Sequence, residues 1–191
     1  ENRLKEKIDR NGVITQYNYN MYQNLLYRKT KDNSLQEIYT YSKDGYLESA
    51  ISKGMQYNYT YDIMGRIESK SASGRTLISY EYDKNGNKIK EIDITGKVSE
   101  FTYNELDLLK NVVYNGNSIA TYEYYNNGLI KNLKNGSLEQ QYSYDKDLNL
   151  ASLNVKHNND LIVSNRYRYD GNGNRKSKQM FDNLTRYYYT E

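Results

Sequence analysis

The chain has 191 residues with 27 Lys and Arg against 24 Asp and Glu, a net charge of +3, and the two signs are interspersed. This balance argues against a nucleic-acid-binding protein, which usually carries a basic stripe, and no stretch approaches the roughly 20 apolar residues that cross a bilayer. Because the chain has no cysteine, its fold does not depend on disulfide bonds.

Tyrosine is the dominant apolar residue, with 24 Tyr against 2 Phe and no Trp. The mean hydropathy of -1.03 is typical of a disordered chain, but disordered segments contain few aromatic residues. A tyrosine can bury its ring while its hydroxyl bonds water or a polar partner. The chain also has no proline, so no backbone donor is lost from a hydrogen-bonded ladder. The composition therefore permits an uninterrupted β-sheet.

A Tyr-x-Tyr pattern recurs along the whole chain. Its second aromatic lies at Tyr19, Tyr41, Tyr61, Tyr82, Tyr103, Tyr124, Tyr144, Tyr169 and Tyr189, at intervals of 20 to 25 residues. Its first aromatic lies at Tyr17, Tyr39, Tyr59, Tyr80, Phe101, Tyr122, Tyr142, Tyr167 and Tyr187. A fixed period in this range indicates stacked units that share one core. Each pair is predicted to lie in a β-strand, in which alternation places Ile78, Tyr80 and Tyr82 on one face.

A turn is predicted directly after each pair. The next position carries Asp62, Asp83, Asp145 or Asp170, with Asn20, Ser42 and Asn104 as substitutes and Tyr125 as an exception. Asp, Asn and Ser side chains can bond the backbone two residues on and so begin a turn. Four residues after the second Tyr comes Gly45, Gly65, Gly86, Gly128 or Gly173, which suits a positive φ. Because Gln23, Asp107 and Leu148 occupy this position elsewhere, we expect those three turns to be built differently.

A second turn is predicted at Gly12, Gly54, Gly74, Gly96, Gly116 and Gly136. Contexts such as "NG", "SG" and "TG" are typical of two-residue hairpin loops. Each unit thus consists of strand, turn, strand and turn, which predicts an all-β fold of repeated antiparallel β-hairpins of about 21 residues. Residues 1–191 are predicted to be a single array of about nine units, truncated at both ends.

The phrases "YEYDKNGNKI" (80–89), "YTYDIMGRI" (59–67) and "YRYDGNGNR" (167–175) resemble the YD repeats of the Rhs family. That family includes bacterial polymorphic toxins, wall-associated proteins, insecticidal toxin complexes and teneurins. The resemblance implies a continuous, curved or spiralling sheet that forms part of a hollow shell. In toxin members the shell encloses a C-terminal toxin domain, and many carry a proline-containing core motif with an aspartyl autoprotease. This chain has no proline and no such segment, so self-cleavage is not expected.

The residues that define the repeat are predicted to be structural, and no catalytic, metal-binding or cofactor-binding residue is predicted. The structural set is Tyr19, Tyr41, Tyr59, Tyr61, Asp62, Gly65, Tyr80, Tyr82, Asp83, Gly86, Tyr103, Tyr122, Tyr124, Gly128, Tyr142, Tyr144, Asp145, Tyr167, Tyr169, Asp170 and Gly173.

Four functional interpretations compete with this structural one. The Tyr pairs could stack on sugar rings. "DKNGN" (83–87) and "DGNGN" (170–174) are similar to calcium-loop fragments, but their twelfth positions are Ile94 and Phe181 where an EF-hand has a bidentate Glu. The only histidine, His157, could be a general base, although a polar residue in a lengthened hairpin loop is the simpler interpretation. The basic stretch 168–178, with Arg166, could contact an anionic polysaccharide, but a solvated strand face is favoured.

The leading functional hypothesis is a structural segment of a YD-repeat shell from a secreted or surface-displayed bacterial protein, which encloses or presents a toxin domain. The alternative is a carbohydrate- or cell-surface-binding repeat module. Expected partners are the neighbouring repeats, a toxin-domain cargo and a surface glycan, with no nucleic acid and no membrane span. Because unpaired sheet edges recruit other chains, edge-to-edge self-association is also expected.

Overall fold

The computed structural model describes residues 3–181 and 183–189. The prediction of an all-β array of antiparallel hairpins is confirmed: within these ranges eighteen strands form one sheet, and there is no helix. The first nine are β1 (Glu6–Ile8), β2 (Ile14–Tyr19), β3 (Leu25–Thr30), β4 (Gln36–Tyr41), β5 (Leu47–Ser52), β6 (Met55–Tyr61), β7 (Ile67–Ala72), β8 (Arg75–Tyr82) and β9 (Lys88–Asp93). The other nine are β10 (Val98–Tyr103), β11 (Leu109–Tyr114), β12 (Asn117–Tyr124), β13 (Ile130–Asn135), β14 (Leu138–Tyr144), β15 (Leu150–His157), β16 (Asp160–Tyr169), β17 (Arg175–Met180) and β18 (Asn183–Arg186).

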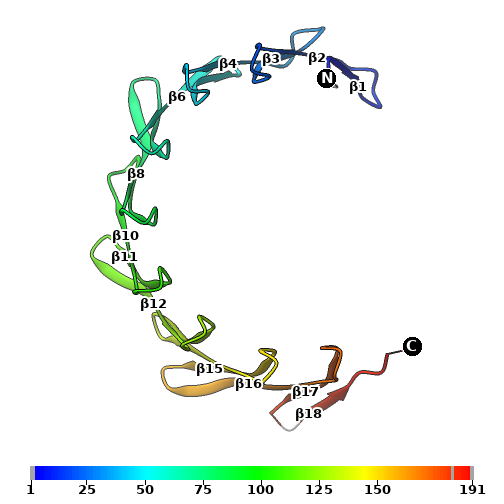
Figure 1. The fold of residues 1–191 in the computed structure, drawn as a ribbon, viewed down its shortest axis with the longest axis vertical. Helices are drawn as coiled ribbons and strands as arrows, with labels where there is room; N and C mark the ends of the chain where they lie inside the picture. The colour runs from blue at the N-terminus through cyan, green and yellow to red at the C-terminus, as the bar shows by residue number, and fades with distance from the viewer. Residues whose placement is uncertain (1–2, 182, 190–191) are drawn as a thin grey trace. The chain divides into compact units, whose positions relative to one another are not determined.

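The chain divides into two compact units, which comprise residues 1–81 with 90–97 and residues 82–89 with 98–191. In the first unit, each strand from β1 to β8 pairs antiparallel with the next strand in the sequence. In the second unit, β10 to β18 pair in the same way (Figure 1). Every contact between neighbouring strands is therefore local in sequence.

A β-bulge recurs at the second tyrosine of the repeat. In the pair β4–β5, Thr40 lies opposite Ser49 but Tyr41 lies opposite Leu47, so that Glu48 has no counterpart. The register shifts in the same way at Tyr19, Tyr61, Tyr103, Tyr124, Tyr144 and Tyr169. A bulge bends its strand and increases the local twist, so each repeat has a fixed irregularity at this point.

The turns without glycine have the same construction as the turns with it, so the expectation that they would differ is wrong. The N–H of Gly65 donates to the carbonyl of Asp62 at 2.9 Å, and Gln23, Asp107 and Leu148 make the equivalent bonds at 2.9, 3.0 and 3.1 Å. These three residues have φ values of 69°, 56° and 65°, in the left-handed region. The hydrogen bonds at the turn impose this conformation even on L-residues, at a cost of roughly 1–2 kcal/mol each.

The second class of turn is also only partly as predicted. Ser52 lies opposite Met55, Ala72 opposite Arg75 and Tyr114 opposite Asn117, so Gly54, Gly74 and Gly116 do lie in two-residue loops. Gly12 and Gly96 do not. Their N–H groups donate to the carbonyls of Asp9 and Asp93, and these loops are of the longer Asp-x-x-Gly type. The reason is that Asp9 and Asp93 stand three residues before the glycine and begin the turn there.

The lengthened repeat around His157 also differs from its prediction. The extra residues extend β15 and β16 rather than the loop, which contains only Asn158 and Asn159 between the paired residues His157 and Asp160. His157 is the exposed last residue of β15. It belongs to a strand end, where ladder pairing fixes its backbone.

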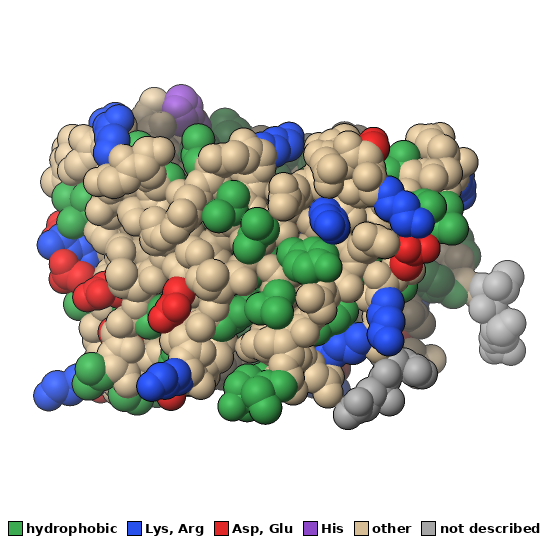
Figure 2. All heavy atoms as spheres, turned by 90° about the horizontal axis from the view of Figure 1, so that it is seen from above, with side chains coloured by type: hydrophobic (Ala, Val, Ile, Leu, Met, Phe, Trp, Pro, Cys, Tyr) green, Lys and Arg blue, Asp and Glu red, His purple; other side chains and the backbone are tan. Residues whose placement is uncertain are grey.

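Side chains in this fold are partly buried in rows across the strands, and the described residues do not form a closed hydrophobic core. Among the described residues no large side chain is fully buried, and the buried residues are small or polar: Thr30, Ser49, Ala72, Ala120 and Asn165. One row on the tyrosine face runs across the strands from Tyr39 to Ala50, Tyr57 and Ala72, alternating large and small side chains. Hydrophobic and charged side chains lie interspersed on the side of the molecule seen in Figure 2. Cross-strand contacts of this kind contribute roughly 0.2–1 kcal/mol each, so stability depends on their repetition.

Gly65 provides a test of how closely adjacent repeats pack. Its φ is +78°, and a Cβ placed there would overlap the ring and hydroxyl of Tyr46, whose ring stacks on Tyr61 with centroids 4.9 Å apart. We predict that Gly65→Ala destabilises the first unit in urea unfolding by more than Gly173→Ala does. The control glycine has φ +81° but open space around its Cβ position, so it should lose only about 1–2 kcal/mol from backbone strain. Equal losses would contradict the close approach.

Candidate functional site

The candidate site is the junction between successive repeats, where a tyrosine of one repeat meets the backbone of the repeat before it. The hydroxyl of Tyr61 donates a hydrogen bond to the carbonyl of Leu47 at 3.0 Å. Leu47 begins β5 and lies opposite Tyr41, the equivalent tyrosine of the preceding repeat. The ladder between β5 and β6 extends only as far as Ser49 opposite Asn58, so the carbonyl of Leu47 lies beyond its end. The tyrosine thus satisfies a polar group that strand pairing does not reach.

The same hydrogen bond recurs through both units at distances of 2.7 to 3.1 Å. We call the donors the junction tyrosines: Tyr19, Tyr41, Tyr61, Tyr103, Tyr124, Tyr169 and Tyr189, whose acceptors are the carbonyls of Leu4, Leu25, Leu47, Lys88, Leu109, Leu150 and Arg175. The pattern of the sequence locates these tyrosines but gives no indication of their acceptors, because the acceptors are backbone groups that a bulge sets apart from the ladder.

Tyr144 is held differently from the junction tyrosines. The ring of Tyr125 meets the ring of Tyr144 edge to face, with centroids 6.1 Å apart, and the Tyr125 hydroxyl donates to the carbonyl of Tyr142 at 3.0 Å. Tyr125 is the residue that stands where other repeats have Asp, Asn or Ser. Its departure from the pattern therefore supplies an alternative junction contact, which sequence reasoning missed. Tyr82 is the half-buried last residue of β8.

The first tyrosines of the pairs lie on the same face, and each is half-buried: Tyr59, Tyr80, Tyr122, Tyr142 and Tyr167. Several stand beside a cation. The Nζ of Lys70 lies 4.5 Å from the ring centre of Tyr57 and 5.8 Å from that of Tyr59, and the guanidinium of Arg175 lies 4.9 Å from that of Tyr167. Tyr142 instead donates its hydroxyl to Oε1 of Gln140 at 2.6 Å. Cations thus cover aromatic faces that a stacking sugar would need.

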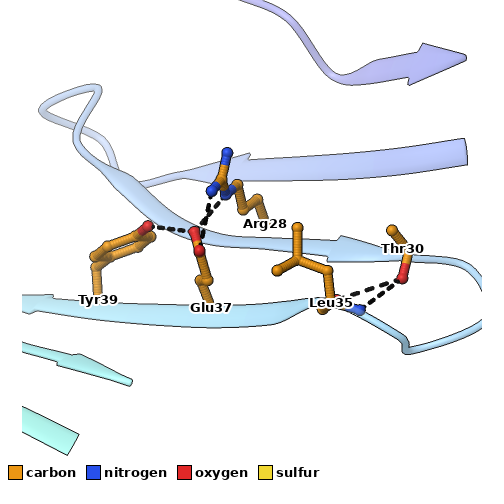
Figure 3. A network of polar contacts seen from close by, with 5 residues as sticks. All are labelled: Arg28, Thr30, Leu35, Glu37 and Tyr39. Atoms are coloured by element: carbon orange, nitrogen blue, oxygen red, sulfur yellow. Dashed lines mark hydrogen bonds and ion pairs between the residues drawn. The ribbon is translucent and has the colours of Figure 1, made fainter. Parts of the chain in front are cut away.

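One polar network is fixed on the tyrosine face of the first unit (Figure 3). The Arg28 guanidinium forms a bidentate ion pair with the Glu37 carboxylate, and the Tyr39 hydroxyl donates to the same carboxylate at 2.6 Å. Burial and the hydrogen bond to Glu37 raise the pKa of Tyr39 to about 12. The side chain of Glu37 is 12% exposed, so the network is anchored at its carboxylate. It ties three neighbouring positions of β3 and β4 together.

The aspartates of the turn use their carboxylates within the turn itself. Oδ1 of Asp62 accepts the N–H groups of Met64 and Arg66 at 2.9 and 3.0 Å, and Asp170 does the same with Asn172 and Asn174 at 3.0 and 2.9 Å. Asp83 and Asp145 accept equivalent bonds from Asn87 and Asn149. Gly65, Gly86, Gly128 and Gly173 complete these turns with φ values between 78° and 96°. In the part of the chain that the structure describes, no group of three or more acidic, His or Cys side chains is arranged to hold a metal ion.

These features define a class of protein: an array of antiparallel hairpin repeats. A turn most often begun by Asp, Asn or Ser closes one end of the hairpin, and in most repeats a tyrosine hydroxyl bonds the backbone of the preceding repeat. The repeats resemble those of the Rhs/YD type. No family model matches the chain. Within the described ranges there is no helix long and apolar enough to span a membrane.

Two curated relatives carry the sequence similarity. The chain is 37% identical over 91 residues to the tRNA3(Ser)-specific nuclease WapA of Bacillus spizizenii and 34% identical over 91 residues to the tRNA nuclease WapA of Bacillus subtilis. The match covers 47% of this chain but only 4% of each relative. The similarity therefore concerns a small part of those proteins.

Two solved structures carry the fold similarity. A crystal structure of TcdB2-TccC3 superposes with a TM-score of 0.74 at 15% identity, over 92% of this chain and 11% of that chain. The Tc holotoxin pore of Photorhabdus luminescens superposes with a TM-score of 0.71 at 15% identity, over 89% of this chain and 10% of that chain. At this identity the comparison establishes the fold, which is that of a segment of a much longer chain.

The junction hydrogen bond can be tested by removing one hydroxyl. We predict that Tyr61→Phe lowers the free energy of unfolding by roughly 1–2 kcal/mol, because the carbonyl of Leu47 loses its partner. Hydrogen exchange should rise locally in β5 and β6. Tyr59→Phe is the matched control, since no hydrogen bond of the Tyr59 hydroxyl is found in the described structure, and it should change stability less. An equal effect of both variants would mean that the junction bond contributes nothing specific.

The turn carboxylates predict acid sensitivity. The backbone N–H of Asn174 lowers the pKa of Asp170 from its ordinary value of 3.8, and the N–H of Arg66 likewise lowers the pKa of Asp62. A carboxyl whose pKa is lower in the folded state stabilises the fold above its unfolded pKa, and this stabilisation is lost as the pH falls through the folded pKa. We therefore expect stability to decline below about pH 4.

The substitution Asp170→Asn separates charge from turn geometry. Asn104 already accepts the same two backbone N–H bonds in its own turn, at 2.9 and 3.0 Å, so the amide should preserve the turn at neutral pH. Urea unfolding as a function of pH should then show a smaller acid loss in the second unit, and Asn104→Asp should enlarge it. An unchanged pH profile in both variants would contradict the assignment.

Proposed function

We propose that this chain is a wall segment of an Rhs/YD-repeat shell, part of a secreted or surface-displayed bacterial protein in which the shell encloses or presents a C-terminal toxin domain. The repeats form a single array of about nine units across residues 1–191. The function is steric, because a continuous hydrogen-bonded wall separates a cargo from its surroundings without any reacting group. The observation that carries this proposal is the junction hydrogen bond, which seven junction tyrosines, distributed over both units, form with the repeat before their own.

The physical design of the repeats suits a wall. A sheet of sequential hairpins can be lengthened by adding repeats, since each hairpin contacts only its neighbours. Polar groups at the ends of the ladders are bonded by tyrosine hydroxyls, so the sheet needs no second layer to satisfy them. Because the described part has no closed core of large side chains, both faces remain free to meet other molecules.

The similar proteins support the proposal because the chain matches only a small part of each of them. WapA is named as a tRNA nuclease, and the chain matches only 4% of it, which is consistent with a repeat region separate from the nuclease activity. The fold matches segments of TccC3-containing toxin chains. We accordingly assign no enzymatic step to these repeats, and place the activity of the parent protein, and its toxin-domain partner, in the rest of that protein.

The carbohydrate-binding alternative has less support at the tyrosine pairs. The junction hydroxyls are used within the sheet, and cations cover the rings of Tyr57, Tyr59 and Tyr167.

Self-association through the edges of the sheet stays a prediction for the chain when it is separated from its parent.

The enclosure function predicts that intact junctions protect the cargo. In the complete parent protein, we expect the C-terminal domain to resist proteases that cut the same domain when it is expressed alone. Replacing Tyr41, Tyr61 and Tyr124 together by Phe should loosen three junctions and make the domain cleavable, as followed by limited proteolysis and mass spectrometry. The control replaces Tyr57, Tyr59 and Tyr122 by Phe, whose hydroxyls form no hydrogen bond within the described residues. A C-terminal domain cut equally fast with and without the intact shell would refute enclosure.

A further inference from the structure

Two tyrosines from outside the Tyr-x-Tyr pairs contact a tyrosine of the next repeat. Tyr46, which follows the turn after β4, stacks on Tyr61 at the end of β6, with ring centroids 4.9 Å apart and ring planes inclined by 30°. Tyr125, which follows β12, meets Tyr144 at the end of β14 edge to face, with centroids 6.1 Å apart. Each contact lies within one compact unit. Ring contacts thus join consecutive repeats in both units.

The Tyr46–Tyr61 pair is close and can be reached from solvent. Its centroid separation is near the short end of the range for aromatic pairs. Because Gly65 has no Cβ, the hydroxyl end of the Tyr46 ring fits over it. Tyr46 is 41% exposed, so its ring can turn, whereas the hydroxyl of Tyr61 is held by the carbonyl of Leu47. The pair therefore combines one fixed ring with one accessible ring.

The composition of the chain directs one-electron oxidation to tyrosine. Tyr, Trp and Cys are the side chains that give up a single electron most readily, and this chain has 24 Tyr with no Trp and no Cys. Its four Met are oxidised by a different route, in which the sulfur gains an oxygen atom. A radical formed on one tyrosine has no thiol or indole in the chain to react with. A second tyrosine is therefore its available partner.

Other tyrosines are less suited to this reaction. A cation next to a ring opposes the removal of an electron, because it repels the positive charge that forms. The Nζ of Lys70 lies 4.5 Å from the ring centre of Tyr57, and that of Lys131 lies 6.0 Å from the ring centre of Tyr125. The contact between Tyr125 and Tyr144 is also the wider of the two ring contacts. The stacked pair in the first unit is therefore the preferred site.

We infer that Tyr46 and Tyr61 are a site of oxidative cross-linking, at which a haem peroxidase with hydrogen peroxide joins the two rings as dityrosine. Each phenol loses one electron and its hydroxyl proton, and the two radicals combine in a carbon–carbon bond between ring positions next to the hydroxyls. The hydrogens at those positions then move to the oxygens, so both hydroxyls are regained. The two electrons and two protons that were removed reduce one hydrogen peroxide to two water molecules.

The cross-link takes the place of a disulfide bond in a chain that has no cysteine. It closes a loop from residue 46 to residue 61, which contains β5 and β6. Closing such a loop restricts the unfolded chain and so stabilises the fold, provided that the native geometry accepts the bond. The rings already touch, so little rearrangement is needed. The inference does not depend on the enclosure of a cargo, since it concerns only how firmly two repeats are fastened.

The test oxidises the full chain with a haem peroxidase and hydrogen peroxide, in dilute solution so that bonds within one chain form in preference to bonds between chains. Trypsin places Tyr46 in fragment 44–53 and Tyr61 in fragment 54–66. Mass spectrometry detects the two fragments joined with the loss of two hydrogens, and fragmentation locates the bond. Dityrosine fluorescence of the monomeric chain measures the total yield.

We expect the joined fragments 44–53 and 54–66 to be the most abundant dityrosine product of the monomeric chain, with the bond at Tyr61. Tyr46→Phe keeps a stacking ring but has no phenol, so most of the dityrosine fluorescence should be lost. Tyr22→Phe alters a 74% exposed tyrosine of another turn and should keep it. After oxidation, the first unit of the unaltered chain should unfold at a higher urea concentration, and that of Tyr46→Phe should not.

Three results would overturn the proposal. The first is the absence of the joined fragments, and the second is dityrosine spread evenly over the tyrosines of the chain, including Tyr57 and Tyr59. The third is an equal loss of fluorescence in Tyr46→Phe and Tyr22→Phe. An unchanged urea midpoint in the cross-linked chain would overturn its role in fastening the repeats.

Hydrogen exchange in β5 and β6 verifies that Tyr46→Phe is folded. If it fails this check, Tyr61→Phe removes the other phenol of the pair and should likewise lose the joined fragments. An undiminished yield of joined fragments in Tyr61→Phe would again overturn the proposal. Loss of cargo protection in the junction variants is a separate result, so the two proposals can fail independently.

Discussion

The hydrogen bond from a junction tyrosine to the carbonyl of the preceding repeat is the interaction on which the rest of the structure depends. Hairpins with strands of three to ten residues are marginal alone, and the described part of this chain has no enclosed core of large side chains to support them. The bulge at the second tyrosine leaves one carbonyl outside the ladder, and the hydroxyl of a junction tyrosine in the next repeat bonds it, as Tyr61 bonds Leu47. One contact therefore satisfies a polar group, buries an aromatic ring and fixes the spacing between repeats.

The Asp-x-x-Gly turn has a corresponding role at the end of each hairpin. Its geometry is set by hydrogen bonds strongly enough that Leu148 adopts a left-handed backbone in place of glycine. The carboxylate of the Asp that begins the turn accepts hydrogen bonds from two backbone N–H groups, as Asp62 does from Met64 and Arg66. The repeat thus tolerates changes in single residues as long as its hydrogen bonds remain.

The two faces of the sheet have different chemistry. One face carries the tyrosines, the cations that cover them and the Arg28–Glu37–Tyr39 network. The other face carries short polar pairs such as Thr60 with Ser69 and Ser143 with Ser152, whose hydroxyl groups lie 2.8 and 2.6 Å apart. The first face serves the assembly of the array, whereas these hydroxyl pairs join neighbouring strands on the second face.

The sequence by itself determined the fold class, the period and the residues of each turn, because alternation of tyrosines and the Asp-x-x-Gly spacing act over a few residues. It misled at Gln23, Asp107 and Leu148, where the hydrogen bonds of the turn override residue preference, and at Gly12 and Gly96, where an upstream Asp selects the longer loop. Only the tertiary structure decided which carbonyls the tyrosines reach and that Tyr125, an exception to the Asp pattern, contacts Tyr144. It also decided that Arg166, Arg168 and Arg186 share one face, since register and bulges bring together residues that lie up to 20 positions apart in the sequence.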